Sequence, residues 1–599
     1  MCGINGALRY RPGSPIEEPE ILLVRDLMAT RGPDSAGCWI SPDGSVGFGH
    51  RRLSIIDLSA EGNQPMSDST GRYIITFNGE IYNYQALRDE LLAAGHEFRS
   101  RSDTEVILRL YSLHGPRMLE RLRGMFGLAI WDTQDRTLLL ARDALGIKPL
   151  YVADDGQTLA FASQVKPLLE SCNVDTSPEP AAHFGYFLLG HVPEPYTLYK
   201  GIRSLPAGSY MLIENAGSRR QVQYYDPKSW LLVDPVVGNR QELREALVDT
   251  IRHHYVADVP VSLFLSAGKD STTMLALASE ADQPNVKAVT LGFKEFAGTQ
   301  DDETILASEV AQQYDAEHIV HFVTKDQFRN DIDTLYRVMD QPSVDGANTY
   351  FVCRVAAEHG VKVAMSGLGA DEVFGGYPSF FQVPKMTRNL GWSKSLPFLG
   401  RGFRKTVQGL KLHPSPKFAG LVEYGSSVEM AYLLRRGLYM PWEIFEFLDP
   451  DFARTGWETL DIEGQYRSLT TGLPTTHAKV AMLEFTSYMQ HRLLRDSDWA
   501  SMASSLELRV PFVDTEFLQR IGPWVASSSP PNKNDMALCP KNPLPQEVLN
   551  KPKTGFNIPV ADWTSSKAPG SEPPLRQWSK LVYRQFAGSD MLVKSRIPA

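Results

Sequence analysis

The chain has few cysteines, no long apolar run and no excess of positive charge. Its five cysteines form no Cys-x-x-Cys pair and no zinc-ligand spacing, so we expect free thiols and a cytoplasmic protein. No apolar stretch reaches membrane-spanning length and the N-terminus lacks a signal-peptide pattern, so we expect no membrane partner. The formal net charge of -9 argues against a nucleic-acid partner, because binding to a phosphate backbone usually needs a basic face.

Length and the order of predicted elements indicate more than one domain. The 599 residues, 43% of them hydrophobic, are enough for at least two cores. From residue 259 on, β-rich runs alternate with a helical pattern; strands are expected at residues 287–291, 318–324 and 361–366, and a helix at 304–312. This alternation predicts a doubly wound parallel sheet, with ligands at the carboxyl ends of its strands.

One segment of this second part, Val259–Ser271, has the pattern of a strand, a phosphate-binding loop and a helix. An apolar β-branched run ends at Ser266 and Gly268, and Asp270 and Ser271 then open a helical pattern. Backbone N–H groups at such a turn favour an anion, and Asp270 offers an oxygen ligand for Mg²⁺. The alternative is an ordinary strand-to-helix turn. The spacing resembles the Ser-Gly-Gly-x-Asp-Ser loop of ATP pyrophosphatases, with alanine in place of the first glycine.

A second glycine-rich cluster follows the strand expected at residues 361–366. It reads Ser366-Gly-Leu-Gly-Ala-Asp-Glu-Val-Phe-Gly-Gly-Tyr377. Glycines let a ligand approach the backbone, and Asp371 could share a Mg²⁺ with Asp270. A glycine-rich turn with solvated acids is the alternative.

At the start of the chain, Cys2 directly follows Met1. Removal of Met1 would leave Cys2 with a free α-amine, whose unperturbed pKa of about 7.7 to 8.0 suits it to take the thiol proton. A chance cysteine near the start is the alternative, and the downstream residues decide between the two.

Four polar clusters follow Cys2 in a fixed order. They are Arg31-Gly-Pro-Asp34, His50-Arg-Arg-Leu-Ser-Ile55, Asn78-Gly-Glu-Ile-Tyr-Asn83 and Ser102-Asp-Thr-Glu-Val106. Such clusters at the ends of β-rich runs lie where loops present reactive groups. Together with Cys2 they resemble the glutaminase domain of the class II, N-terminal-nucleophile amidotransferases. The resemblance covers about the first 210 residues and implies an αββα sandwich.

The same resemblance implies the roles of individual residues. Cys2 would attack the side-chain amide of glutamine, while the Asn78 side chain and the Gly79 N–H form the oxyanion hole. The implied glutamine-binding set is Arg52, Ile55, Asn78, Glu80 and Asp103. Within it, the arginine would pair with the α-carboxylate and the two acids with the ammonium group. The products would be glutamate and ammonia.

Further motifs extend the resemblance to the whole chain. Besides the cluster at Ser366, they are Asp301-Asp-Glu-Thr304, Asp340-Gln-Pro-Ser343, Ser501–Phe512 and Lys551-Pro-Lys-Thr-Gly-Phe556. With the N-terminal set, the chain resembles the glutamine-dependent asparagine synthetases from end to end. This implies a glutaminase domain over residues 2–210, a linker over 211–239, and an adenylating synthetase domain over 240–599, with an ATP-pyrophosphatase fold and helical additions.

The implied reaction of the synthetase domain is adenylation followed by amide formation. A carboxylic-acid acceptor attacks the α-phosphorus of Mg-ATP, and ammonia from the Cys2 site then displaces AMP. Lys533 lies upstream of Leu544-Pro545 at the sequence spacing of the family's catalytic lysine. Asp270 and Asp371 would hold Mg²⁺. The implied ATP-binding set is Leu265, Ser266, Gly268, Asp270, Ser271, Leu291, Ser366 and Gly367. The oligomeric state stays open, with a homodimer as one option.

Two departures from the family bear on the acceptor. Leu368 stands where asparagine synthetases often have glutamate and β-lactam synthetases have tyrosine. Leucine cannot transfer a proton, which favours amide formation by unprotonated ammonia over β-lactam ring closure. The segment Asp345–Thr349 lacks the arginine that would suit the α-carboxylate of aspartate. The acceptor is therefore aspartate or a larger acid of a specialised pathway.

Other departures motivate a different class of function. Ala267, Lys269, Trp499 and the stretch Met536-Ala537 after Lys533 differ from the residues that relatives usually carry. A degenerate synthetase kept as a binding or regulatory subunit is therefore the alternative, against which tight Mg-ATP binding would count. A tRNA-modifying pyrophosphatase is a third option, opposed by the complete glutaminase set.

Overall fold

The protein is described from a computed structural model, in which the described residues are 2–11, 13–214, 217–281, 286–299, 302–410, 412–413, 415–552, 563 and 572–587. Met1, Asp301 and residues 553–556 of the predicted motifs lie outside the described residues. Within these ranges, no helix is both long and apolar enough to cross a membrane.

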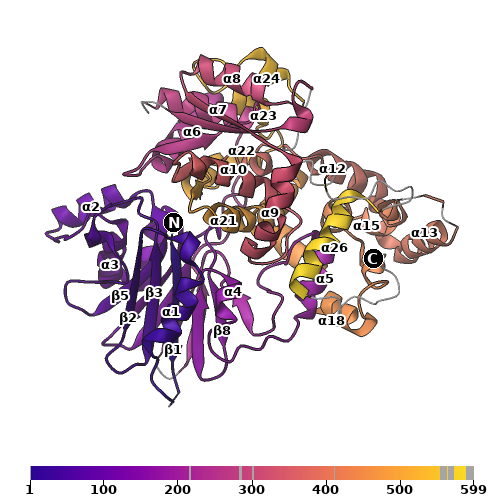
Figure 1. Ribbon diagram of the computed structural model, residues 1–599. Helices are drawn as coiled ribbons and strands as arrows, with labels where there is room; N and C mark the ends of the chain where they lie inside the picture. Colours follow the sequence, from indigo (N-terminus) through magenta and orange to yellow (C-terminus); the bar gives the residue numbers. More distant parts are fainter. Residues whose placement is uncertain are drawn as a thin grey trace.

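The N-terminal part is built on two antiparallel sheets (Figure 1). The first has the strand order β10 (Ile202–Ser204), β8 (Tyr151–Asp154), β9 (Thr158–Ala162), β1 (Gly3–Arg9), β3 (Val46–Arg52), β2 (Ser35–Ile40). The second has the order β12 (Arg219–Gln223), β11 (Ser209–Glu214), β7 (Thr137–Arg142), β6 (Gly124–Asp132), β5 (Tyr73–Ile81), β4 (Met66–Ser67).

The two sheets pack face to face through one apolar layer. Ile4 and Phe48 of the first sheet and Trp131 and Leu140 of the second belong to a single buried cluster. Helix α1 (Glu18–Asp26) covers the outer face of the first sheet, and α2 (Tyr84–Ala93) and α3 (Asp103–His114) lie on the side of the second. The implied αββα sandwich is confirmed.

The second sheet continues past residue 210, where the glutaminase domain was expected to end. Strands β11 and β12 form an antiparallel hairpin, and β11 also pairs with β7. We therefore propose that the first domain extends to Gln223, the last residue of β12.

The C-terminal part contains the expected parallel sheet. Its order is β15 (Glu317–Val323), β14 (Lys287–Phe293), β13 (Val261–Phe264), β16 (Val363–Met365), β17 (Glu507–Arg509), and every neighbouring pair is parallel. Helix α6 (Arg240–His254) precedes the first strand, and the helices between the strands include α7 (Lys269–Glu280), α8 (Thr304–Gln313), α9 (Lys325–Val338) and α10 (Ala347–Glu358). The chain reverses its winding between β13 and β16, the point where doubly wound sheets bind ligands.

Helical additions follow β16. They are α11 (Ala370–Val373), α12 (Ser379–Leu390), α13 (Pro397–Gly409), α14 (Pro416–Ala419), α15 (Leu421–Tyr424), α16 (Val428–Arg436), α17 (Pro441–Ile444), α18 (Pro450–Leu460), α19 (Ile462–Thr470), α20 (Thr476–Leu483), the π-helix η6 (Glu484–Leu494), α21 (Arg495–Met502), α22 (Thr515–Val525), α23 (Lys533–Ala537), α24 (Gln546–Asn550) and α26 (Pro574–Ala587).

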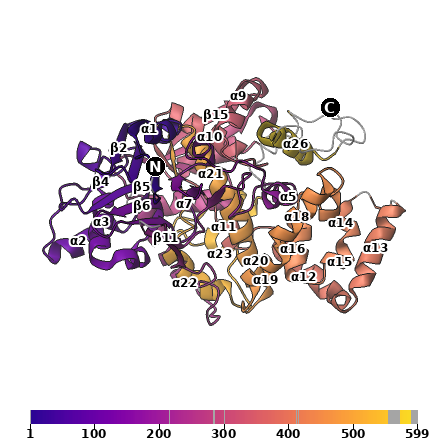
Figure 2. The same ribbon diagram turned by 90° about the horizontal axis from the view of Figure 1, so that it is seen from below.

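One helix from the N-terminal third lies within these additions. Helix α5 (Pro180–Leu189) is buried from Ala181 to Leu189 and packs on α18. Figure 2 also shows α5 beside α26, where the Tyr186 hydroxyl donates to the Ser579 carbonyl over 2.8 Å. The two parts of the chain therefore share an extensive packed boundary.

Candidate active sites

The first site lies where β1 begins, beside the middle of β5. The Cys2 N–H donates to Asn78 Oδ1 over 2.9 Å, and this fixes the Asn78 amide. The other end of that amide, Nδ2, is buried and has no hydrogen-bond partner among the described residues. Burial raises the pKa of the Cys2 thiol, whereas a hydrogen bond from the Leu53 backbone and the charge of Arg52 oppose this shift. A buried amide donor with no partner, next to a thiol, is the arrangement that an oxyanion hole requires.

Gly79, the other expected oxyanion donor, sits at a close approach of two strands. A Cβ at this position would lie 2.1 Å from the Met125 carbonyl oxygen, so only glycine fits between β5 and β6. The backbone register of Asn78 and Gly79 beside Cys2 thus depends on the absence of a side chain.

Arg52 lies near the same thiol at the end of β3. Its guanidinium donates to the Ser59 carbonyl over 2.8 Å, to Asn63 Oδ1 over 2.9 Å and to the Ile56 and Asp57 carbonyls. Among the described residues, no carboxylate lies within 4.0 Å of it. Its charge is therefore available to a substrate carboxylate. Ile55 is buried and its carbonyl accepts from the Asp258 N–H over 2.9 Å.

The two acids expected to bind an ammonium group are both buried. Oε2 of Glu80 has no hydrogen-bond partner in the described part of the chain, and its nearest cation, Arg509 Nη2, is 3.7 Å away. Burial and the neighbouring Glu507 raise the pKa of Glu80 well above its usual value. Burial also raises the pKa of Asp103, to about 6, although the Ile81 N–H donates to its carboxylate. A substrate ammonium would donate a hydrogen bond to Glu80 Oε2, which has none, and would add a positive charge beside both acids.

This burial predicts a pH effect on glutamine use. As pH falls through about 6, Asp103 takes up a proton and loses the charge that would attract an ammonium group, so kcat/KM for glutamine should fall. Asp103→Asn should lower kcat/KM for glutamine at pH 8 by about ten- to a hundredfold, because a charged hydrogen bond is lost. The fall of kcat/KM at acid pH should also become smaller in this variant. Glutamate release between pH 5 and 9 measures both. Asp89→Asn, at an exposed acid of α2, is the control; an unchanged acid limb in Asp103→Asn would contradict the assignment.

The second site is a cavity of about 390 Å³ at the carboxyl ends of β13 and β16, which we call the loop cavity. It brings together seven of the eight residues expected to bind ATP, namely Leu265, Ser266, Asp270, Ser271, Leu291, Ser366 and Gly367. The eighth, Gly268, is the N-cap residue of α7 and does not line it. Ser271 Oγ donates to the Ser266 carbonyl over 2.5 Å and closes the turn. The open N-terminus of α7 faces this turn and favours an anion there.

Lys533, at the start of α23, contacts two aspartates that line this cavity. Its Nζ lies 2.5 Å from Asp270 Oδ1 and 3.0 Å from Asp371 Oδ1. Although burial opposes the charge, the two aspartates hold the pKa of Lys533 above its usual value. Lys269 Nζ donates to Asn534 Oδ1 over 2.7 Å and ties α23 to the loop. Lys269, which departs from the family loop, therefore helps to hold α23, the helix that carries Lys533, in place.

The donor set around Lys533 fits Mg²⁺ in part. Asp270 and Asp371 both approach Lys533 Nζ, so the lysine ammonium holds the place that a cation shared by the two carboxylates would take. The described residues contain no cluster of three or more side chains that could hold a metal ion. Mg²⁺ often binds through one or two carboxylates and completes its shell with phosphate and water oxygens. The pair therefore fits an ion that arrives with a nucleotide.

Several residues of the loop cavity were not predicted from the sequence. They include Asn348, Thr349, Glu372, Tyr377 and Tyr488. Burial and the neighbouring Asp371 raise the pKa of Glu372 to about 8, and the Tyr377 hydroxyl donates to it over 3.0 Å. Glu372 and Tyr377 stand inside the glycine-rich motif, which was a usable signal. Tyr488 lies in η6 and has no such signal.

The structure also accounts for two departures near Asp345. Arg492 of η6 pairs with Asp345 over 3.1 Å, so a cation reaches this segment from another element. Trp499 donates to Asp496 Oδ1 over 3.0 Å and packs on Gly346, where a Cβ would lie 2.4 Å from the indole ring. Gly346 has a φ of 85°, which glycine adopts without strain. Trp499 is thus a packing residue of this turn.

Buried groups connect the two sites. Arg31 Nε donates to the Cys2 carbonyl over 3.1 Å, and the same guanidinium makes a two-pronged pair with Asp498 of α21, over 2.7 and 3.1 Å. A void of about 10 Å³ beside Asp498 is also lined by Lys148 and Leu508. Leu508 lines the loop cavity as well. A line of buried side chains thus runs from the Cys2 backbone to the loop cavity.

The Arg31–Asp498 pair should matter for stability. Arg31→Met leaves Asp498 buried without its main partner, which should lower the unfolding free energy by about 3–5 kcal/mol. The double variant Arg31→Met/Asp498→Leu should recover much of this loss, because no buried charge is then stranded. Urea unfolding followed by tryptophan fluorescence measures the change. Arg454→Met breaks an exposed pair with Asp451 and should shift the midpoint of urea unfolding little. Equal shifts in Arg31→Met and Arg454→Met would contradict the prediction.

Comparison with known proteins gives two family matches and related sequences along most of the chain. Residues 1–225 match the family model "Glutamine amidotransferase domain", and residues 242–572 match "Asparagine synthase". Asparagine synthetase (glutamine-hydrolyzing) 1 of Bacillus subtilis is 31% identical over 95% of this chain and 88% of its own length. Asparagine synthetase B (glutamine-hydrolyzing) of Escherichia coli is 32% identical over 64% of this chain and 66% of its own.

Among solved structures, one match is the glutamine phosphoribosylpyrophosphate amidotransferase of B. subtilis in complex with ADP and GMP. It is 18% identical, covers 53% of this chain and 65% of its own, and has a TM-score of 0.29.

Proposed function

The chain belongs to the family of glutamine-hydrolysing asparagine synthetases, and on this basis we propose that it adenylates a carboxylic acid and amidates it with ammonia cut from glutamine. It is a glutamine-dependent amidotransferase, and the asparagine synthase part uses ATP as a substrate. The acceptor, the metal and the residue roles are the proposed parts.

In the proposed glutaminase step, Cys2 becomes the N-terminal residue and its own α-amine takes the thiol proton. The thiolate attacks the amide carbon of glutamine, and the developing oxyanion accepts hydrogen bonds from Asn78 Nδ2 and the Gly79 N–H. Asn78 Nδ2 supports this role because it is buried without a partner. The leaving nitrogen takes a proton and departs as ammonia, and water then cleaves the thioester to give glutamate.

Three charged groups are proposed to orient glutamine for that attack. Arg52 would receive the α-carboxylate, and Glu80 and Asp103 would receive the ammonium group. Support comes from Arg52, which has no carboxylate partner among the described residues, and from Oε2 of Glu80, which has no hydrogen-bond partner there. Ile55 and the Asn78 side chain would complete the pocket.

In the proposed synthetase step, a carboxylate oxygen of the acceptor attacks the α-phosphorus of ATP and expels pyrophosphate. Ammonia then attacks the carbonyl carbon of the acyl adenylate and expels AMP, which keeps that oxygen. Lys533 is placed to stabilise negative charge on the phosphates, and the loop from Ser266 to Ser271 would bind the pyrophosphate. Bound Mg²⁺, held by Asp270 and Asp371, would neutralise charge on the leaving pyrophosphate.

Ammonia would travel through the boundary between the two domains. The buried line past Arg31, Asp498 and Leu508 offers a route that excludes bulk water. Ammonia stays unprotonated in such surroundings, so attack needs little help from a base. This is consistent with Leu368 in place of an acidic residue.

The observation that best supports the synthetase activity is Lys533 Nζ between Asp270 and Asp371 at the edge of the loop cavity. The direct experiment is a pyrophosphate-release screen over many carboxylic acids, including aspartate, with glutamine and Mg-ATP. We expect release that depends on the acid and on glutamine together. ADP and phosphate as products would rule out the proposed chemistry.

A degenerate synthetase remains the alternative to catalysis of this second step. It would serve as a binding or regulatory subunit and would form no acyl adenylate. Calorimetric titration with Mg-ATP distinguishes the two proposals. No binding would favour a degenerate domain, and tight binding would favour the synthetase. The formed loop cavity and the placement of Lys533 support the synthetase.

A further inference from the structure

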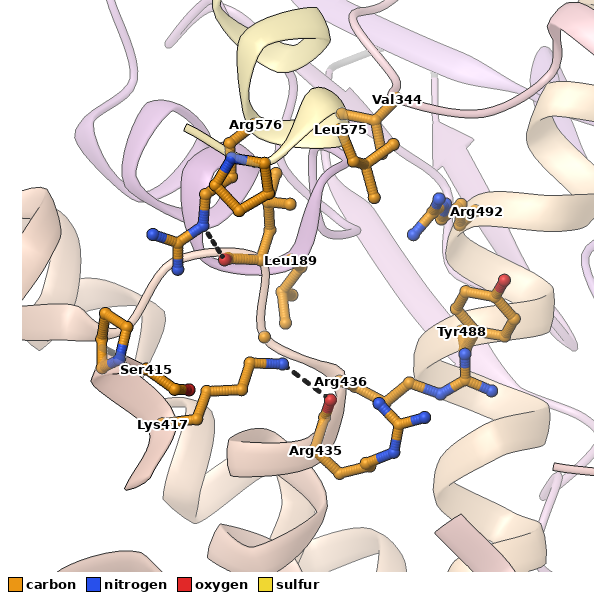
Figure 3. A pocket seen from close by; sticks show the side chains of 14 residues that line it. Leu189, Val344, Ser415, Lys417, Arg435, Arg436, Tyr488, Arg492, Leu575 and Arg576 are labelled. Atoms are coloured by element: carbon orange, nitrogen blue, oxygen red, sulfur yellow. Dashed lines mark hydrogen bonds between the residues drawn. The ribbon is translucent and has the colours of Figure 1, made fainter. Parts of the chain in front are cut away.

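A second cavity, of about 710 Å³, lies beside the loop cavity and shares Tyr488 with it. Five cationic side chains line it, and we call it the basic cavity: Lys417, Arg435, Arg436, Arg492 and Arg576. Several elements contribute these cations (Figure 3): Arg576 comes from α26, Arg492 from η6, Lys417 from α14, and Arg435 and Arg436 both from the end of α16. No motif in the sequence marks this set.

The charges in the basic cavity do not balance. Three of the cations have a carboxylate partner; the pairs are Arg436 with Glu484 at 2.6 Å, Arg492 with Asp345 at 3.1 Å and Arg576 with Glu443 at 2.7 Å. Lys417 and Arg435 have no carboxylate within 4.0 Å in the part of the chain that the structure describes. Two of the five positive charges are therefore uncompensated.

Both uncompensated cations are partly shielded from water. Lys417 Nζ donates to the Arg435 carbonyl over 2.8 Å. Burial, with the charges of Arg435 and Arg576, lowers the pKa of Lys417 to about 8. Arg435 Nε is buried and has no hydrogen-bond partner among the described residues. Keeping like charges together at this depth costs free energy, which a bound anion would offset.

The basic cavity adjoins the loop cavity at a wall made of side chains. Tyr488 lines both cavities, and the Arg436 guanidinium stacks on its ring with the central carbon 3.7 Å from the ring centroid. Asp345 lines the loop cavity, while its partner Arg492 lines the basic cavity. An acceptor that holds its carboxyl group in the loop cavity and extends past Tyr488 would bring its far end to the cations.

We propose that the basic cavity binds a phosphate ester group on the acceptor, so that the acceptor is a phosphorylated carboxylic acid rather than free aspartate. This proposal rests on the proposed function, since it names the acceptor class of the same reaction. A phosphate monoester dianion matches the two uncompensated charges, and guanidinium groups bind phosphate oxygens in two-pronged geometry. A cavity of about 710 Å³ also exceeds the needs of an acid as small as aspartate.

Binding of inorganic phosphate tests the cavity without relying on turnover. Calorimetric titration is done on the full chain with Mg²⁺ and α,β-methylene-ATP, which keep phosphate out of the loop cavity. Wild type should bind phosphate saturably, and Lys417→Met/Arg435→Gln should bind at least about tenfold more weakly. Arg401→Gln/Lys405→Met removes two exposed charges of α13 and should change affinity less than about twofold. No saturable binding, or equal affinity in the cavity variant, would overturn the proposal.

Turnover then tests the acceptor class. Pyrophosphate release is compared for glycerate and 3-phosphoglycerate, and for serine and phosphoserine, with aspartate alongside. We expect kcat/KM to be at least about tenfold higher for the phosphorylated member of a pair, and this preference to disappear in Lys417→Met/Arg435→Gln. Glutamate release should stay at the wild-type rate in that variant. If no acid supports pyrophosphate release, the proposed function fails. The calorimetric titration then still tests whether the basic cavity binds phosphate. If aspartate is preferred and the variant uses it normally, the inference fails alone.

Discussion

Replacing Cys2 with alanine is expected to abolish glutamine hydrolysis, with a loss of about a thousandfold or more in kcat. No other thiol or hydroxyl is assigned the attack on the amide, so no alternative covalent route exists in the proposed mechanism. Ammonium chloride should restore acceptor-dependent pyrophosphate release in the same variant, because the loop cavity is built from other elements. Glutamate and pyrophosphate are measured in parallel reactions.

Two controls make the Cys2→Ala result specific. Cys38→Ala changes a half-buried thiol of β2 and should leave both activities unchanged. Intact mass should show that the wild-type protein lacks Met1, since the α-amine of Cys2 is the proposed base. Glutamate release that persists in Cys2→Ala, or a mature protein that keeps Met1 and is active, would contradict the assignment.

Replacing Lys533 with methionine should remove the synthetase activity and leave the glutaminase activity in place. We expect pyrophosphate release and amide formation to fall by about a hundred- to a thousandfold, the usual effect of losing a preorganised charge in a reaction centre. Glutamine hydrolysis without acceptor should change less than about twofold, because Lys533 contacts Asp270 and Asp371 and no residue of the Cys2 site. The two rates are measured on one preparation.

The control for Lys533→Met removes a lysine close in sequence. Lys541 is exposed and its side chain has no assigned role, so Lys541→Met should behave like wild type. Mg-ATP binding to Lys533→Met, followed by calorimetry, separates a lost charge from a collapsed site. Full synthetase activity in Lys533→Met would remove the lysine from the proposed mechanism.

Local pattern was enough to predict the core of the second domain. The run from Val259 to Ser271 gave β13, the loop and α7, because strand and helix periodicity and the intervening glycine are all encoded within a dozen residues. The sandwich of the first domain followed from its resemblance to a family, since short alternating strands do not reveal how sheets stack. Seven of the eight residues that the same resemblance named for ATP binding line the loop cavity, and Gly268 does not, whereas Tyr488 and other lining residues were not named.

Contacts between distant segments could not be predicted in this way. Asp270 and Lys533 are 263 positions apart, and Arg31 and Asp498 are 467 apart, so no spacing rule relates them. The basic cavity is the extreme case, because each of its cations sits in an ordinary helical or loop sequence and only the fold brings them together. Arg492 near Asp345 shows the same limit, since a charge missing from one segment is supplied by another.

The most direct test of the central claim follows one oxygen atom. The acceptor found by the pyrophosphate screen is labelled with ¹⁸O in its carboxylate and incubated with the enzyme, Mg-ATP and glutamine. Phosphorus NMR and mass spectrometry then locate the label among the nucleotide products. Attack on the α-phosphorus predicts one ¹⁸O in AMP, with pyrophosphate unlabelled and glutamate formed in equal amount. Label in inorganic phosphate, with ADP as the other product, would contradict the proposed mechanism.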